Sequence, residues 1–151
     1  MNSPSQRYLF VDFDGCLHSN QATPQEWFIR APALEHALAP SSVALVISSS
    51  WRFHFPKQEI LARLPRGLAD RVVGFTGDAL VGTHARYHEI CAWQRLHASG
   101  DFRCLDDAHW EFPRDCPQLI LCNGAIGLAE RELDQLRRWL EIPSASECAA
   151  M

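Results

Sequence analysis

The ten residues LFVDFDGCLH, numbered 9–18, join a short apolar run to two carboxylates and a glycine. A continuous apolar run such as Tyr8–Asp12, ending in turn residues, is typical of a strand covered on both faces. Alternation along the strand predicts that Asp12 and Asp14 point to the same side of the chain. Gly15 then allows the backbone to turn sharply or to approach a ligand closely. A simple turn that uses Asp and Gly for their conformational preferences is the alternative interpretation.

Four more apolar runs follow along the chain and alternate with helical patterns. We predict further strands at Val43–Ile47, Arg71–Phe75, Phe102–Leu105 and Leu119–Cys122, and helices at Pro32–Leu38, Pro56–Leu64, His84–His97 and Ile126–Leu140. Such alternation predicts an α/β fold, a three-layer sandwich whose central Rossmann-like sheet has five parallel strands. In sheets of this kind, ligands bind beyond the carboxyl ends of the strands.

The 151-residue length fits a single domain, which we place at residues 7–142, with flexible ends at 1–6 and 143–151. The polar opening of the chain does not resemble a secretory leader, and the apolar runs are far shorter than the roughly 20 residues of a membrane helix. We therefore expect a cytoplasmic protein without a membrane partner. Its six cysteines form no C-x-x-C pair, which favours reduced thiols. The formal net charge of −4 argues against a dominant electrostatic grip on nucleic acid.

Polar groups end two other predicted strands, and the fold brings them to the same rim as Asp12 and Asp14. These are the serine run Ser48–Ser50 and the acidic pair Asp106 and Asp107. Two carboxylates roughly 5 Å apart repel by on the order of 3 kcal/mol at an effective dielectric of about 20, so four of them require a cation. Oxygen ligands without paired His or Cys favour Mg²⁺. The serines suit phosphate oxygens, although serine also favours helix caps.

At this point the sequence resembles a known superfamily over roughly residues 8–125. The stretch 9–18 resembles the first motif of haloacid dehalogenase (HAD) phosphatases, D-x-D-G-x-L. Val43–Ser48 resembles their second motif, and Phe102–Asp107 resembles their fourth, an apolar strand that ends in an acidic pair. More narrowly, DFDGCLHS, VISSSWRF and CLDDAHWEFP are similar to the small HAD domains of Swiss Army Knife RNA repair proteins.

The resemblance implies a role for each matching residue. Asp12 is the expected nucleophile, which forms an aspartyl-phosphate. Asp14 is expected to protonate the leaving oxygen and then activate water, while its backbone carbonyl binds Mg²⁺. Ser48 is expected to hydrogen-bond the transferred phosphoryl group. Together with Asp12, Asp107 is the expected direct metal ligand, and Asp106 a nearby or water-mediated one.

The basic residue of the third motif is the least defined part of the resemblance. Lys57, the only lysine, follows the serine motif too closely, whereas Arg86 opens a helix after the third strand. An arginine fork grips phosphate well, although a solvated helix face is an equally good interpretation of Arg86. The expected substrate contacts around this site are Gly15, His18, Ser49 and Arg52.

The substrate class follows from the size of the segments that cap the site in this superfamily. Ser19–Pro40 holds at most a turn and one helix, and Gly77–Thr83 is brief, so we expect a minimal or absent cap. In the family an open site implies a large substrate, such as an RNA or DNA end that carries a terminal phosphate. The alternatives are a small-metabolite phosphatase or phosphotransferase, and a non-catalytic HAD-fold binding module. The sequence leaves the oligomeric state open.

Overall fold

The computed structural model describes residues 6–97 and 100–142. Within these ranges the chain forms one five-stranded parallel sheet with the strand order β3-β2-β1-β4-β5. The strands are β1 (Tyr8–Val11), β2 (Ala44–Ile47), β3 (Val72–Phe75), β4 (Phe102–Asp106) and β5 (Leu119–Leu121). The predicted α/β class and Rossmann-like parallel sheet are thereby confirmed. The predicted flexible ends lie outside the described residues, except for Gln6. The C-terminal end includes Cys148, one of the six cysteines.

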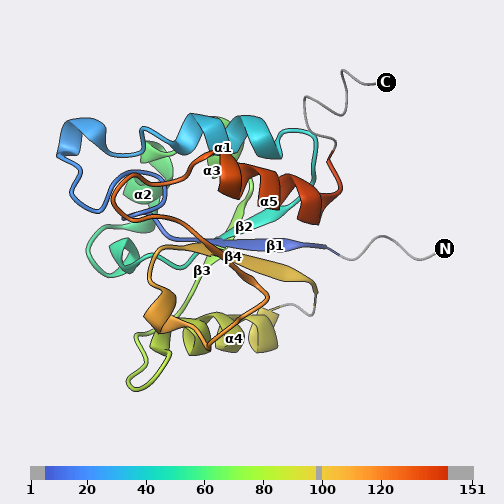
Figure 1. The fold of residues 1–151 in the computed structure, drawn as a ribbon. Coiled ribbons are helices and arrows are strands. Elements are labelled where there is room, and N and C mark those ends of the chain that lie inside the picture. Colours follow the sequence, from blue (N-terminus) through green and yellow to red (C-terminus); the bar gives the residue numbers. More distant parts are fainter. Residues whose placement is uncertain (1–5, 98–99, 143–151) are drawn as a thin grey trace.

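Helices cover both faces of this sheet, so the sandwich has three layers (Figure 1). The helices α1 (Ala31–Leu38), α3 (Arg66–Ala69) and α5 (Glu130–Leu140) lie over one face, and α4 (Ala85–His97) lies over the other (Figure 1). The remaining helical segments are α2 (Lys57–Arg63) and three short 3₁₀ turns, η1 (Pro24–Glu26), η2 (Ser50–Phe53) and η3 (His109–Glu111).

The central strands are apolar in succession because both of their faces are buried. Leu9 and Val11 of β1 contribute to the core under α1 and α5, whereas Phe10 between them packs with Ile90 and Trp93 of α4. The alternation of a strand therefore divides its side chains between two cores. This arrangement accounts for the continuous apolar runs that predicted the sheet.

The register of the sheet decides which residues meet at its carboxyl edge. Val11 of β1 pairs with Ile47 of β2 and with Leu105 of β4. The next residue of each chain segment is therefore Asp12 in the centre, with Ser48 on one side and Asp106 on the other. Three segments far apart in sequence thus converge, as the strand order required.

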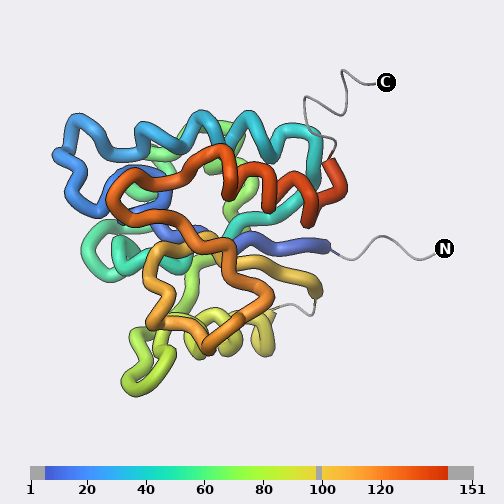
Figure 2. Tube along the Cα trace, viewed as in Figure 1, coloured from blue at the N-terminus to red at the C-terminus, as the bar shows by residue number. Residues whose placement is uncertain are grey.

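The clearest difference from the predicted elements is the start of the last helix. The pattern placed it at Ile126, but α5 begins at Glu130. Residues 123–128 instead form a turn in which the amide of Gly127, at φ +80°, donates to the carbonyl of Asn123. The amide of Leu128 donates to the carbonyl of Cys16, so this turn lies beside the loop that follows β1 (Figure 2).

The segments that follow the strands are short. Between β1 and β2 the chain forms only η1 and α1, and between β3 and α4 it forms a loop. Across the described residues, no inserted domain covers the carboxyl edge of the sheet. Of the helices in those ranges, none combines the length and the apolar character needed to span a membrane.

Candidate active site

Arg86 connects two carboxylates at the carboxyl edge of the sheet. Its Nη1 atom lies 3.3 Å from Oδ1 of Asp12 and 2.8 Å from Oδ2 of Asp106. All three side chains are largely removed from solvent, with 15% of Arg86, 8% of Asp12 and 1% of Asp106 exposed. The solvated helix face considered for Arg86 is therefore not its environment. Asp106 also accepts a hydrogen bond from the amide of Ala108, at 2.9 Å, which fixes its carboxylate.

The acids outnumber the basic groups that face them. Burial and the charge of Asp106 raise the pKa of Asp12 well above its usual range, although Arg86 opposes the shift. Burial also raises the pKa of Asp106 and of Asp107. Arg86 supplies one positive charge against these three carboxylates, so with all three ionised the site would carry an uncompensated negative charge, which a divalent cation would neutralise.

The donor atoms at this position fit Mg²⁺. Asp12, Cys16 and Asp107 each offer a ligand atom, and these atoms lie within 4.8 Å of one another. The sulfur of Cys16 is a soft donor that a hard cation such as Mg²⁺ disfavours, and burial raises the pKa of its thiol. The remaining donors are carboxylate oxygens, which are the ligands that Mg²⁺ prefers.

Two glycines make room for the carboxylate of Asp107. A Cβ atom added at Gly15 or at Gly124 would overlap Oδ2 of Asp107. Gly15 also has a φ of +83°, a conformation that side chains disfavour. Gly15 therefore serves the approach of Asp107 in this structure, while its expected substrate contact stays a prediction. Gly124, which follows β5, was not singled out in the sequence, although a glycine beside Asn123 is a common turn signal.

The serine run divides into two environments. The hydroxyl of Ser48 is buried and has no hydrogen-bond partner among the described residues. A buried unpaired hydroxyl is costly, so its position calls for a ligand oxygen. The hydroxyl of Ser49 instead accepts from the amide of Trp51 at 3.2 Å and caps η2. Ser49 is fully buried, which is unfavourable for the substrate contact expected of it.

Asp14 is held by donors on both of its oxygens. Its Oδ1 lies 2.8 Å from Nε2 of His18, and its Oδ2 accepts from the indole nitrogen of Trp51 at 3.1 Å. The hydrogen bond with His18 is the main cause that lowers the pKa of Asp14. His18 was expected to touch substrate, but only 1% of it is exposed, so it reaches a substrate only through Asp14. Trp51, which directly follows the serine run, is likewise buried.

Arg52 is an internal brace in this structure rather than an open phosphate contact. Its guanidinium donates to the carbonyls of Ser48, Ser49 and Gly77, and it forms a 2.7 Å ion pair with Glu89 of α4. Only 3% of the Arg52 side chain is exposed. It thereby ties the serine loop to the helix that carries Arg86. The sequence alone did not indicate this pairing with Glu89.

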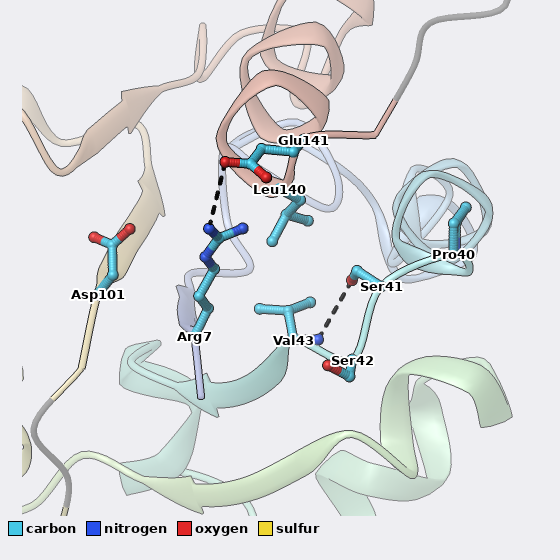
Figure 3. Close-up of a pocket in the computed structure, with 8 residues that line it drawn as sticks. All are labelled: Arg7, Pro40, Ser41, Ser42, Val43, Asp101, Leu140 and Glu141. Atoms are coloured by element: carbon cyan, nitrogen blue, oxygen red, sulfur yellow. Dashed lines mark hydrogen bonds and ion pairs between the residues drawn. The ribbon is translucent and has the colours of Figure 1, made fainter. Parts of the chain in front are cut away.

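A separate hollow lies at the opposite edge of the sheet (Figure 3). It is lined at the amino ends of β1, β2 and β4 by residues that include Arg7, Val43 and Asp101. Two of the lining residues, Arg7 and Glu141, form an ion pair at 3.9 Å, and the Glu141 side chain is largely exposed. This hollow shares no residue with the acidic site.

Comparison with known proteins identifies one family. A family model described as the HAD domain in Swiss Army Knife RNA repair proteins matches residues 8–133. No curated protein and no solved structure matches the chain. The matched range extends from β1 into α5 and includes every candidate site residue named above.

Proposed function

The chain belongs to the family of HAD domains in Swiss Army Knife RNA repair proteins, as its motifs predicted, and from this premise we propose its chemistry. Membership supports a hydrolase of the HAD type. We propose that the chain is a Mg²⁺-dependent phosphatase that removes a terminal phosphate from nucleic acid through an aspartyl-phosphate on Asp12. The supporting observation is the position of Asp12 directly after the central strand β1. Arg86 lies 3.3 Å from it, and Ser48, whose hydroxyl has no hydrogen-bond partner among the described residues, directly follows the neighbouring strand β2.

The proposed reaction has two steps, both centred on phosphorus. A carboxylate oxygen of Asp12 bonds to phosphorus while the bond from phosphorus to the leaving oxygen breaks, and Asp14 gives a proton to that oxygen. Asp14 then takes a proton from water, whose oxygen attacks phosphorus. Inorganic phosphate leaves and the carboxylate of Asp12 is regenerated. Splitting one displacement into two is the general advantage of a covalent intermediate.

Two donors support the phosphoryl group in this proposal. In the described part of the chain, both carboxylate contacts of Arg86 use Nη1, and a guanidinium carries five N–H donors. The remaining donors suit a phosphate, which arginine binds in a bidentate manner. The Ser48 hydroxyl provides another donor, and the phosphate oxygen would satisfy its missing hydrogen bond.

The metal would be held by the side chains of Asp12 and Asp107 and by the backbone carbonyl of Asp14. When bound, Mg²⁺ neutralises charge on the phosphoryl oxygens and lets an anionic carboxylate approach them. Asp106, which pairs with Arg86 at 2.8 Å, is better placed to orient that arginine than to bind the cation directly.

A large substrate is favoured by the open rim. Half of the Asp14 side chain is exposed, and only η1, α1 and a loop occupy the positions of the family's caps. The family description names RNA repair, which makes a terminal phosphate of RNA the first substrate to test.

The experiment is phosphate release from a substrate panel, with Mg²⁺ or with EDTA. The panel holds RNA and DNA oligonucleotides with 3′ or 5′ phosphates, nucleotides and sugar phosphates. We expect Mg²⁺-dependent release from oligonucleotide ends, no release by Asp12→Asn, and unchanged release by the control Asp115→Asn, an exposed aspartate on the loop before β5. Acid-quenched wild-type protein should carry one phosphoryl group on the peptide that contains Asp12.

Three other outcomes of this experiment would indicate a different function or a different mechanism. Release only from small phosphates would indicate a metabolite phosphatase or phosphotransferase. Turnover that survives Asp12→Asn would refute the aspartyl-phosphate. Binding of phosphorylated oligonucleotides without any release would indicate a non-catalytic module.

A further inference from the structure

The carboxylate of Asp14 is unusually constrained for a group that is half exposed. An exposed aspartate ordinarily exchanges its hydrogen bonds with water and rotates about its side-chain bonds. Here each oxygen has its own protein donor, His18 at 2.8 Å and Trp51 at 3.1 Å. The two donors come from different loops, one after β1 and one after β2, so the carboxylate plane is fixed from two directions.

The donor atom of His18 is determined by its second ring nitrogen. Nδ1 of His18 accepts a hydrogen bond from the amide of Phe28 at 3.0 Å, so it carries no proton. The neutral ring must then carry its proton on Nε2, the atom that faces Asp14. His18 is therefore set as a donor to Asp14 by the backbone at Phe28.

The residue that makes this contact, Phe28, has an unfavourable backbone conformation. Its φ is +63°, which is a genuine outlier for a bulky side chain. Such strain persists where the surroundings enforce it, often at functional sites. The rings of Phe28 and His18 pack edge to face at 5.2 Å, which holds the imidazole in place.

The side chain of Trp51 is held in place by its neighbours, as that of His18 is. Its amide is capped by the hydroxyl of Ser49, and its ring stacks on Phe55 at 4.7 Å and meets Phe13 and Phe28 edge to face. The residue is 5% exposed, so the indole N–H has little access to any acceptor other than Asp14. The motif VISSSW thus supplies three groups within four residues: the buried hydroxyl of Ser48, the cap of Ser49 and the indole N–H of Trp51 that donates to Asp14.

We infer that His18 and Trp51 are positioning residues that hold Asp14 for proton transfer with the leaving oxygen and the attacking water. This inference rests on the proposed phosphatase function. A carboxylate offers about four lone-pair sites, so two fixed donors leave one site on each oxygen for the transferred proton. Neither residue touches the phosphoryl group, and both act through the orientation of Asp14.

The test compares two phosphate esters that differ in their need for an acid. The leaving oxygen of p-nitrophenyl phosphate departs readily without a proton, whereas the sugar oxygen of an oligonucleotide terminal phosphate does not. Trp51→Phe removes the N–H and keeps an aromatic ring. Because both esters form the same aspartyl-phosphate, kcat/KM isolates the step in which the leaving oxygen departs. We expect Trp51→Phe to lower kcat/KM on the oligonucleotide by about 10-fold or more and kcat/KM on p-nitrophenyl phosphate by less than about threefold.

Two further variants separate positioning from packing. Trp93→Phe makes the same chemical change in the core under α4 and should leave both rates unchanged. His18→Gln retains an amide donor and should keep more oligonucleotide turnover than His18→Leu, which has none. Equal losses on both esters for Trp51→Phe, or equal activities of the two His18 variants, would overturn the inference.

A readout without turnover keeps the inference apart from the proposed function. Nitrogen NMR of the wild-type chain should show His18 as the neutral tautomer with its proton on Nε2. A proton on Nδ1 would refute the positioning role whether or not the chain hydrolyses phosphate. Absence of turnover together with the Nε2 tautomer would refute the phosphatase proposal, and with it the role in proton transfer, while the donor contact from His18 to Asp14 would stand.

Discussion

Arg86→Met is the perturbation that most directly tests the charge arrangement of the site. Arg86 lies 2.8 Å from Asp106 and 3.3 Å from Asp12. At an effective dielectric of about 20, these pairs attract by roughly 6 and 5 kcal/mol before desolvation is counted. Removing one partner of a buried ion pair leaves the others uncompensated and costs about 3–5 kcal/mol. We therefore expect Arg86→Met to lower the free energy of unfolding by about 3 kcal/mol in metal-free buffer.

Urea denaturation at pH 7 with EDTA, followed by tryptophan fluorescence, measures this loss. The control Arg66→Met changes an arginine whose side chain is 93% exposed and should shift stability by less than about 0.5 kcal/mol. In the Arg86→Met background, Asp106→Asn should restore stability, because it removes one of the uncompensated charges. A loss below about 1 kcal/mol, or no recovery in the double variant, would refute the claim that Arg86 compensates these acids.

Three other perturbations test separate parts of the structure. Ser48→Ala removes a buried hydroxyl that has no hydrogen-bond partner among the described residues. We expect the free energy of unfolding to stay unchanged or to rise by up to about 1 kcal/mol, and phosphate release to fall about 10-fold or more. A clear loss of stability in denaturation would show that the hydroxyl does have a partner. Gly124→Ala should weaken the Mg²⁺-dependent rise in Tm because its Cβ would overlap Asp107, whereas Gly77→Ala, with nothing within 4 Å, should keep that rise; equal behaviour of the two would argue against the cradle. Burial opposes ionisation of Asp101, but the hydrogen bonds from Trp139 at 2.7 Å and from Arg103 prevail and lower its pKa. The stabilisation from Trp139 is therefore present above about pH 5 and is lost as the pH falls through the lowered pKa of Asp101. Trp139→Phe should lower the free energy of unfolding more at pH 7 than at acidic pH, and the difference should be well under 1 kcal/mol. Denaturation measured over a series of pH values would show this.

The sheet was predictable because its information is local. Each strand is a run of three to five residues that ends in turn-forming or polar groups, and burial of both faces makes such runs continuously apolar. Parallel order then brings Asp12, Ser48 and Asp106 to one edge without any knowledge of side-chain contacts. The predicted start of the last helix, Ile126, was wrong because residues 123–128 pack against the loop after β1. The helical period of the sequence does not encode that interaction.

The amino-acid sequence by itself determined the class of the fold, the edge at which the acids gather and the family to which the chain belongs. Only the tertiary structure decided which partner each polar group takes. Arg86 lies between Asp12 and Asp106, Arg52 pairs with Glu89, and His18 lies buried behind Asp14. The physical reason is distance along the chain: these partners are 4 to 74 residues apart, and the direction of a side chain depends on neighbours that only the sheet register and the helix packing bring within hydrogen-bond range.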